Sequence, residues 1–182
     1  MFPTSGRMGA LQEAVGGDLL HFIPELVVCV GIVALLLVRL VPLFDRAHLG
    51  SLAVAFLAIA LFAAGFQVSQ DSWPGPFFTG MLVADPFAGL ARCLVLTGAL
   101  LTALLTQLSG IPDRDDSSDF HTLLLGGTLG MMLMVSANHL LMVVIAVEMA
   151  SLPSYALAGF LKGKKTGSEA ALKYVEIGRA HV

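Results

Sequence analysis

Five long runs of apolar residues, separated by short polar segments, constrain this chain more than any other feature. The hydrocarbon core of a bilayer is about 30 Å thick, so a helix needs roughly twenty apolar residues to cross it. We therefore expect an all-α fold, a polytopic transmembrane helix bundle with five complete helices and the start of a sixth, forming one domain over residues 23–174. The expected helices are Ile23 to Phe44, Leu49 to Val68, Pro86 to Leu108, His121 to Ala137 and Leu140 to Leu161, with the sixth running from Glu169 onward.

The composition excludes other classes of protein. Apolar residues make up 57% of the 182 residues and charged residues only 13%, and the mean hydropathy is +0.86. A soluble domain carries about a quarter charged residues. The net charge of −3 is small and scattered, so no basic face is available for nucleic acid. The lipid bilayer is the expected surrounding.

The fourth and fifth apolar runs are separated only by Asn138 and His139. One continuous helix is the alternative, but about forty residues would overshoot any bilayer. The sequence therefore predicts two helices joined by a tight turn at the membrane surface.

Basic residues near the helix ends predict the orientation, because Lys and Arg favour the cytoplasmic side. The expected helices place most of these residues on one side and only Arg7 on the other. Residues 1–22 are therefore expected outside the cytoplasm, in a multi-pass protein of the bacterial inner membrane. The residues on the cytoplasmic side are Arg39, Arg46, Arg114, Lys162, Lys164 and Lys165.

Motifs of soluble enzymes and metal sites are absent from the sequence. There is no Gly-rich phosphate loop after a strand, no CxxC and no HExxH. Cys29 and Cys93 each lie inside an apolar run, where packing is the expected role. The segment Leu125 to Gly130, LGGTLG, lies within an apolar helix, where small residues permit close helix packing.

Glu148 is the sharpest candidate for function, because it lies near the middle of the fifth apolar run. A charge there costs about 2.5–3.5 kcal/mol on insertion scales, so it needs a partner, a proton or water. Desolvation favours the neutral acid, and a nearby lysine or a hydrated cavity favours the charged form. A proton relay and a structural glutamate bonded to a neighbouring helix are both compatible with this position.

Three further residues accompany Glu148 on the same expected helix. Ser151 and Tyr155 follow at three and seven residues, which places them on the same face. Pro153 removes a backbone donor, so a free carbonyl is expected nearby. Ser151 is expected either to bond the carboxylate or to serve in packing.

Lys173 is the second candidate, following Glu169 by one helical turn in EAALKY. One interpretation is a surface pair at a helix start. The other places Lys173 a turn into the membrane, facing Glu148. The helical periodicity of the sequence is compatible with both interpretations of Lys173.

The other polar residues have simpler expected roles. Arg39 and Arg92 are expected to extend to the membrane surface as anchors. Glu25 and Asp85 precede apolar runs and are expected to be first-turn or cap residues. His121 and His139 are expected to mark membrane interfaces.

The stretch FHTLLLGGTLGMMLMVSANHLLMVVIAVEMASLPSYALAGF, followed by a basic loop and EAALKY, carries a specific pattern. It resembles the antiporter-like, proton-translocating subunits of respiratory complex I, the bacterial NADH:quinone oxidoreductase, and EAALKY is most similar to subunit N. The likeness runs more loosely back to about Phe22 and includes VADPFAGL. Subunits L and M, Mrp-type cation/proton antiporters and membrane hydrogenase subunits share parts of it and remain alternatives.

The resemblance implies roles for two residues. The glutamate of the fifth helix in the family falls on Glu148, and the lysine of the sixth-helix motif falls on Lys173. In the family these residues belong to a proton relay through the membrane, coupled to quinone reduction elsewhere in the complex. NADH, FMN, iron–sulfur clusters and quinone are then used by the complex, and none is expected to bind this subunit. The implied partners are the other membrane subunits of complex I, and a non-catalytic assembly subunit is the alternative of a different class.

The sequence departs from the family pattern after EAALKY, where it reads VEIGRAHV. A common sequencing adapter translated in one frame gives IGRAHV. Residues 175–182 are therefore expected to be a non-native tail on an N-terminal fragment that is inactive as a pump by itself.

Overall fold

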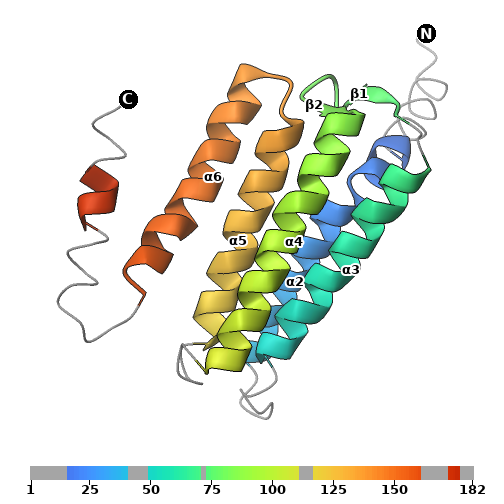
Figure 1. Cartoon of the computed structure of the whole chain (residues 1–182). Coiled ribbons are helices and arrows are strands. Elements are labelled where there is room, and N and C mark those ends of the chain that lie inside the picture. Colours follow the sequence, from blue (N-terminus) through green and yellow to red (C-terminus); the bar gives the residue numbers. More distant parts are fainter. Residues whose placement is uncertain (1–15, 41–48, 71–72, 111–116, 161–171, 177–182) are drawn as a thin grey trace, which may run out of the picture.

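The computed structural model describes residues 16–40, 49–70, 73–110, 117–160 and 172–176. Five long helices run side by side through this part of the chain (Figure 1). Each is long and apolar enough to cross a membrane. The predicted all-α bundle with five spans is therefore confirmed. The helices are α2 (Ile23–Leu40), α3 (Leu49–Ser69), α4 (Pro86–Ser109), α5 (Ser117–Ser136) and α6 (Leu140–Ala158).

Polar residues at the helix ends shift some boundaries from those of the apolar runs. Helix α5 begins at Ser117, before the apolar run, and Asp119 lies in its first turn, where a negative charge favours the helix dipole. Asp85 is the N-cap of α4, as expected, and its side chain accepts a hydrogen bond from the Ala88 amide at 2.6 Å. Residues 172–176 form a helical turn of the expected sixth helix, whose start at Glu169 lies outside the described residues.

A small antiparallel hairpin interrupts the helical pattern between α3 and α4. Strands β1 (Gly75–Phe77) and β2 (Leu82–Ala84) pair, with Phe77 opposite Leu82. The tight turn between them needs positive φ at Phe78, Thr79 and Gly80. The sequence analysis predicted only a break here, because three-residue strands leave no periodic signal.

The hairpin ties together one end of the bundle, which we call the hairpin end. The backbone amide of Asn138 donates to the Met81 carbonyl at 2.9 Å, and its side chain donates to the Gly80 carbonyl at 3.1 Å. The Phe78 amide donates to Asp18 at 2.9 Å. The α5–α6 turn is thus held against the hairpin, which confirms two helices rather than one.

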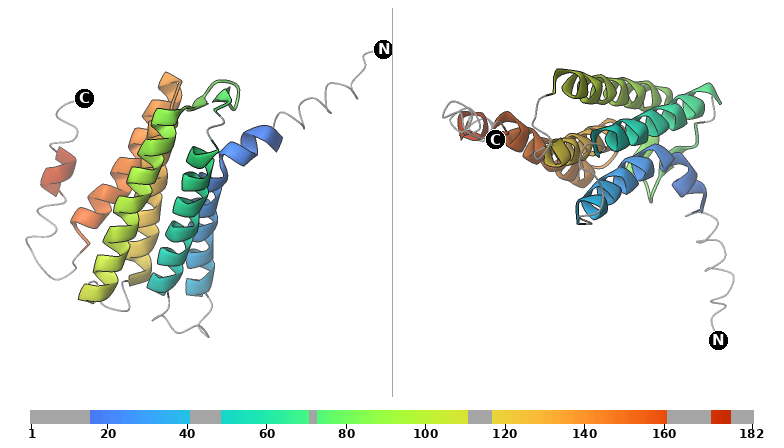
Figure 2. Two further views of the ribbon diagram at one scale, coloured as in Figure 1. Left: turned by 45° about the vertical axis from the view of Figure 1, so that its right-hand side comes forward. Right: turned by 90° about the horizontal axis from the view of Figure 1, so that it is seen from below.

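Helix α5 is the central element of the bundle. It contacts α2, α3, α4 and α6, whereas α6 packs mainly on α5 at the edge of the bundle (Figure 2). Half of the apolar window of α5 is buried, against 11% of that of α6. Most of the surface of α6 is therefore open to lipid or to further protein.

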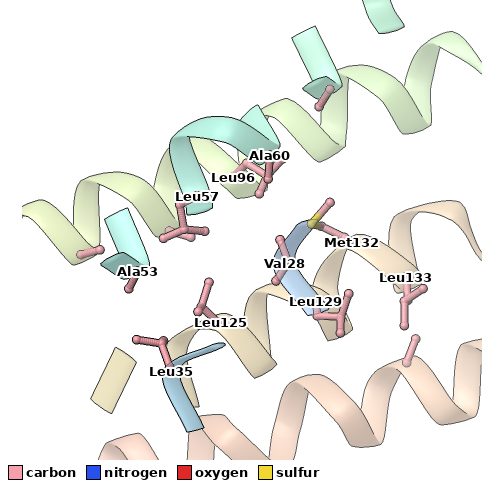
Figure 3. Close-up of a cluster of buried hydrophobic side chains, with 14 of the residues drawn as sticks. Val28, Leu35, Ala53, Leu57, Ala60, Leu96, Leu125, Leu129, Met132 and Leu133 are labelled. Atoms are coloured by element: carbon pink, nitrogen blue, oxygen red, sulfur yellow. The ribbon is translucent and has the colours of Figure 1, made fainter. Parts of the chain in front are cut away.

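Buried side chains recur every three or four residues on the inward faces of α2 to α5, as helical periodicity requires. Figure 3 shows these side chains converging between the helices. Large apolar side chains such as Phe62 and Leu108 point outward, as expected of a bundle surrounded by lipid. The labelled core residues are Val28, Leu35, Ala53, Leu57, Ala60, Leu96, Leu125, Leu129, Met132 and Leu133.

Glycines of α5 allow α6 to approach closely, which confirms the packing role expected for LGGTLG. A Cβ atom at Gly130 would lie 2.5 Å from the Ala150 amide nitrogen and 2.7 Å from the Met149 carbonyl carbon. These are backbone atoms, so no side-chain movement relieves the contact. Gly126 and Gly127 face Pro153 at ordinary contact distances.

We predict that Gly130→Ala loosens the α5–α6 interface. Gly98→Ala in α4 is the matched control, because nothing lies within 4 Å of its Cβ position. Both changes raise helix propensity, so the difference isolates the steric cost, expected at about 1–3 kcal/mol. Unfolding of the full chain in mixed micelles with increasing SDS measures it. Equal stability of the two variants would contradict this packing.

Candidate functional site

The face of α6 that points away from α5 carries Glu148, and its side chain is exposed. Ala146, two residues earlier, is buried against the bundle, and the helical rotation of about 100° per residue puts Glu148 on the opposite face. Among the described residues, the Glu148 carboxylate makes no hydrogen bond or ion pair. A hydrogen-bond or ion-pair partner for this carboxyl therefore has to come from outside the five-helix bundle.

The residues predicted to accompany Glu148 lie along the same helix. The Ser151 hydroxyl donates to the Glu148 backbone carbonyl at 3.2 Å and does not contact the carboxylate. Pro153 lies inside α6 and has no amide to donate to the Met149 carbonyl one turn earlier. Of the two roles considered for Ser151, bonding to the carboxylate is not observed.

The helical turn of residues 172–176 lies beside α6 (Figure 1). The Tyr155 and Tyr174 rings meet edge to face, with centroids 5.2 Å apart at 74°. Tyr155 shares its helix face with Glu148, so the turn that carries Lys173 approaches that face. Lys173 is exposed and forms no ion pair with Glu148 in the described part of the chain.

A second group of ionisable residues, which the sequence analysis did not assemble, lies inside the bundle. Arg92 Nε is 2.8 Å from Glu25 Oε1 and donates a hydrogen bond to Ser136 Oγ at 3.0 Å. The side chains of Glu25 and Arg92 are 0% and 2% exposed. Helices α2, α4 and α5 each contribute one residue to this group, which we call the Glu25–Arg92–Ser136 cluster.

The cluster corrects two expectations. Arg92 does not extend to the surface as an anchor, and Glu25 is more than a first-turn residue, because the two form an ion pair within the bundle. Arg92 occupies the same face of α4 as Ala88, Leu96, Ala99 and Ala103, as their spacing in the sequence indicates, and the structure shows that this face is buried. A charge on a buried face requires a partner of opposite sign on a neighbouring helix.

Arg39 and Asp119 form an ion pair at the end of the bundle opposite the hairpin. Their side chains are 52% and 31% exposed, so water reaches the pair. Arg39 thus lies near a helix end as expected, and its partner on α5 is an addition from the structure. This pair joins α2 to α5 at one end, while the buried cluster joins them at the other.

The two interface histidines differ in position. His139 is the N-cap of α6, and its Nδ1 accepts from the Leu141 amide at 3.2 Å, in keeping with a place at a helix junction. His121 is 1% exposed and packs inside the bundle, with Nδ1 2.7 Å from the Ser117 carbonyl. His121 thus lies one turn inside α5, near the helix start as expected, with its ring packed inside the bundle.

Metal-ligating residues do not gather within the described ranges, where no group of three His, Cys, Asp or Glu side chains meets. Cys29 and Cys93 are free and half-buried, consistent with packing. The charged groups described above are thus the chemistry available in this part of the chain.

Five membrane-spanning helices, buried paired charges and one unpaired membrane carboxyl define a multi-pass helical membrane protein. Curated relatives and a solved structure make this class specific, and they confirm the resemblance to subunit N of NADH-quinone oxidoreductase. The chain is 35% identical to NADH-quinone oxidoreductase subunit N 1 of Solibacter usitatus, over 88% of this chain and 33% of the relative. It is 34% identical to subunit N of Bartonella bacilliformis, over 92% of this chain and 34% of the relative.

The fold agrees with these sequences. A chain of respiratory complex I from Thermus thermophilus, solved with bound aureothin, matches with a TM-score of 0.71 and 30% identity, over 86% of this chain and 33% of that chain. No protein-family model matches the sequence. The chain spans about a third of the length of the relatives it matches.

We predict that Arg92→Leu strongly destabilises the full chain, because it leaves the Glu25 carboxylate buried without a partner. The expected loss is about 3–5 kcal/mol. Arg39→Leu is the matched control, and loss of its water-exposed pair is expected to cost at most about 1 kcal/mol. Unfolding in SDS-containing micelles compares the two.

A double variant separates loss of pairing from loss of packing. Arg92→Leu combined with Glu25→Leu removes both charges, so most of the stability is expected to return. A double variant as unstable as Arg92→Leu alone would show that the ion pair is not the cause.

Proposed function

We propose that this chain is part of a membrane subunit of a proton-pumping NADH:quinone oxidoreductase, and that Glu148 and Lys173 contribute to its proton relay. One observation carries the proposal: Glu148 is an unpaired carboxyl in an apolar helix, on the face approached by the segment that carries Lys173. The similarity to subunit N supports it independently.

The arrangement suits transfer of a proton by way of a carboxyl. A glutamate surrounded by hydrocarbon holds its proton, and an approaching ammonium group favours its release. In this proposal Lys173, on the segment that approaches the Glu148 face, supplies the ammonium group. The T-shaped contact between Tyr155 and Tyr174 keeps the two segments close without fixing an ion pair.

Electron transfer is assigned to other parts of the complex. NADH, FMN, iron–sulfur clusters and quinone are used there, and this chain supplies only membrane helices and ionisable side chains. The proposed partners are the other membrane subunits, which cover the open faces of α6. The surrounding membrane is the bacterial inner membrane.

The orientation follows from the basic residues. Arg39 lies at the end of the bundle opposite the hairpin. The other basic residues assigned to that side, Arg46, Arg114 and Lys162 among them, lie outside the described residues. The hairpin end and the N-terminus then face away from the cytoplasm.

We predict that Glu148→Gln abolishes proton pumping by this subunit while the complex still assembles, because the amide cannot carry the proton. Glu148→Asp keeps the carboxyl and is expected to retain part of the activity. Ser154→Ala on the same helix is the control and is expected to pump normally. Acidification of inverted membrane vesicles driven by NADH, alongside NADH oxidation and assembly assays, measures these effects.

The outcomes separate the candidate functions. Loss of assembly in Glu148→Gln would instead assign the glutamate a structural role. Pumping that depends on Na⁺ would favour a cation/proton antiporter.

Reporter fusions test the orientation. A fluorescent protein inserted after Gly110 is expected to fluoresce in the cytoplasm. Alkaline phosphatase inserted after Gly80, in the hairpin, is expected to be active outside it. The reverse pattern would invert the proposed topology.

A further inference from the structure

The buried ion pair between Glu25 and Arg92 has an incomplete hydrogen-bond geometry. Arg92 Nε lies 2.8 Å from Glu25 Oε1, but its N–H group donates to Ser136 Oγ at 3.0 Å. Ser136 in turn donates to the Met132 carbonyl at 3.1 Å. The carboxylate therefore gains charge attraction from Arg92 without an aligned hydrogen bond.

Three polar atoms of the cluster remain without a hydrogen-bond partner among the described residues. They are both carboxylate oxygens of Glu25 and Nη2 of Arg92, and all are buried. A structural Arg–carboxylate pair normally uses two parallel hydrogen bonds, which would satisfy these atoms directly. Burying these atoms without hydrogen bonds carries a large desolvation cost.

One water molecule has the hydrogen-bonding capacity to satisfy these three atoms. Such a molecule makes about three hydrogen bonds to buried polar groups. The cluster offers two acceptors on Glu25 and one donor on Arg92. Water in this position completes the pair and gives Glu25 a group with which to exchange a proton.

Glu25 is the group in the cluster whose protonation can change, because an arginine keeps its proton in proteins. Helix α3 packs against α2 and carries no titratable side chain. The nearest others on α2 and α4 are the thiols of Cys29 and Cys93. The other titratable groups at the hairpin end are Asp18, His21, Asp85 and His139. Asp119 and His121 lie near the start of α5, at the opposite end of the bundle.

The cluster lies close to the surface at the hairpin end. Glu25 is in the first turn of α2, and Ser136 is the last residue of α5. Ala137 bridges to Leu82 of β2, and Asn138 bonds to the hairpin turn. The hairpin therefore lies next to Ser136 in the chain's contacts, and Glu25 lies within one helical turn of Ile23, where α2 begins.

We propose that Glu25, Arg92 and Ser136 form a hydrated proton-exchange site, in which water bridges Glu25 to Arg92 and Glu25 takes up and releases a proton. The site is separate from the Glu148 face, because it lies inside the bundle of α2, α4 and α5. It gives the chain a second protonatable carboxyl, at the hairpin end. The proposal does not depend on Lys173 or on the partner subunits.

Infrared difference spectroscopy of the full chain in lipid vesicles tests this site. Spectra recorded at acidic and alkaline pH, in H₂O and D₂O, report every carboxyl that gains a proton. The expected result is a carboxyl C=O band that shifts in D₂O, disappears in Glu25→Gln and moves in Glu25→Asp. Ser136→Ala, which retains both charges, is expected to shift the same band through the loss of its hydrogen bond to Arg92.

Glu148→Gln is the matched control, because it removes the carboxyl of the other site. The Glu25 band is expected to persist in this variant, so the result is independent of the proposed relay. A spectrum unchanged by Glu25→Gln, Glu25→Asp and Ser136→Ala would overturn the proposal and leave a permanently charged ion pair. If Glu25→Gln does not fold, Glu25→Asp and Ser136→Ala decide between the two results.

Discussion

Hydrocarbon forms no hydrogen bonds, so the polar groups of this chain need partners within the protein, in a neighbouring protein or in bound water. The five helices satisfy their own backbones. At the hairpin end, the short strands and the Asn138 contacts satisfy the backbone where the chain leaves the helical form. The same requirement brings Glu25 and Arg92 together. Fold and candidate chemistry thus follow from one constraint.

Helix α5 makes this arrangement possible because it presents different residues to each neighbour. Toward α6 it presents glycines, which let the two backbones approach until a single methyl group at Gly130 would collide. Toward α2 and α4 it presents Ser136, whose hydroxyl accepts from Arg92. The polar contact of Ser136 fixes α5 against α2 and α4, and the close packing at Gly130 fixes α6 against α5. The position of α6 then determines where Glu148 points.

The sequence predicts the parts of this structure that depend on local composition. Apolar runs of bilayer length identify the five spans, and Asp85 before a proline identifies a cap. Contacts between helices are harder to predict from the sequence, because they depend on which helix faces meet. The pairing of Arg92 is an example, because the burial of Ala88 and Leu96 on the same face of α4 is a property of the folded bundle. Glu148 could be predicted as a candidate from the sequence, because a single acid in an apolar run is unusual however the helix packs.

The carboxyls of Glu25 and Glu148 differ in what surrounds them, and this difference separates their proposed roles. Glu25 faces inward and meets a fixed guanidinium within one compact unit of helices. Glu148 faces outward, on the same helix face as Tyr155, whose ring contacts Tyr174 in the helical turn of residues 172–176. A carboxyl with a fixed partner keeps a constant environment, whereas one whose partner sits on a separate segment changes environment when that segment moves. This difference is why we propose Glu148 for the relay and Glu25 for exchange with water at the hairpin end.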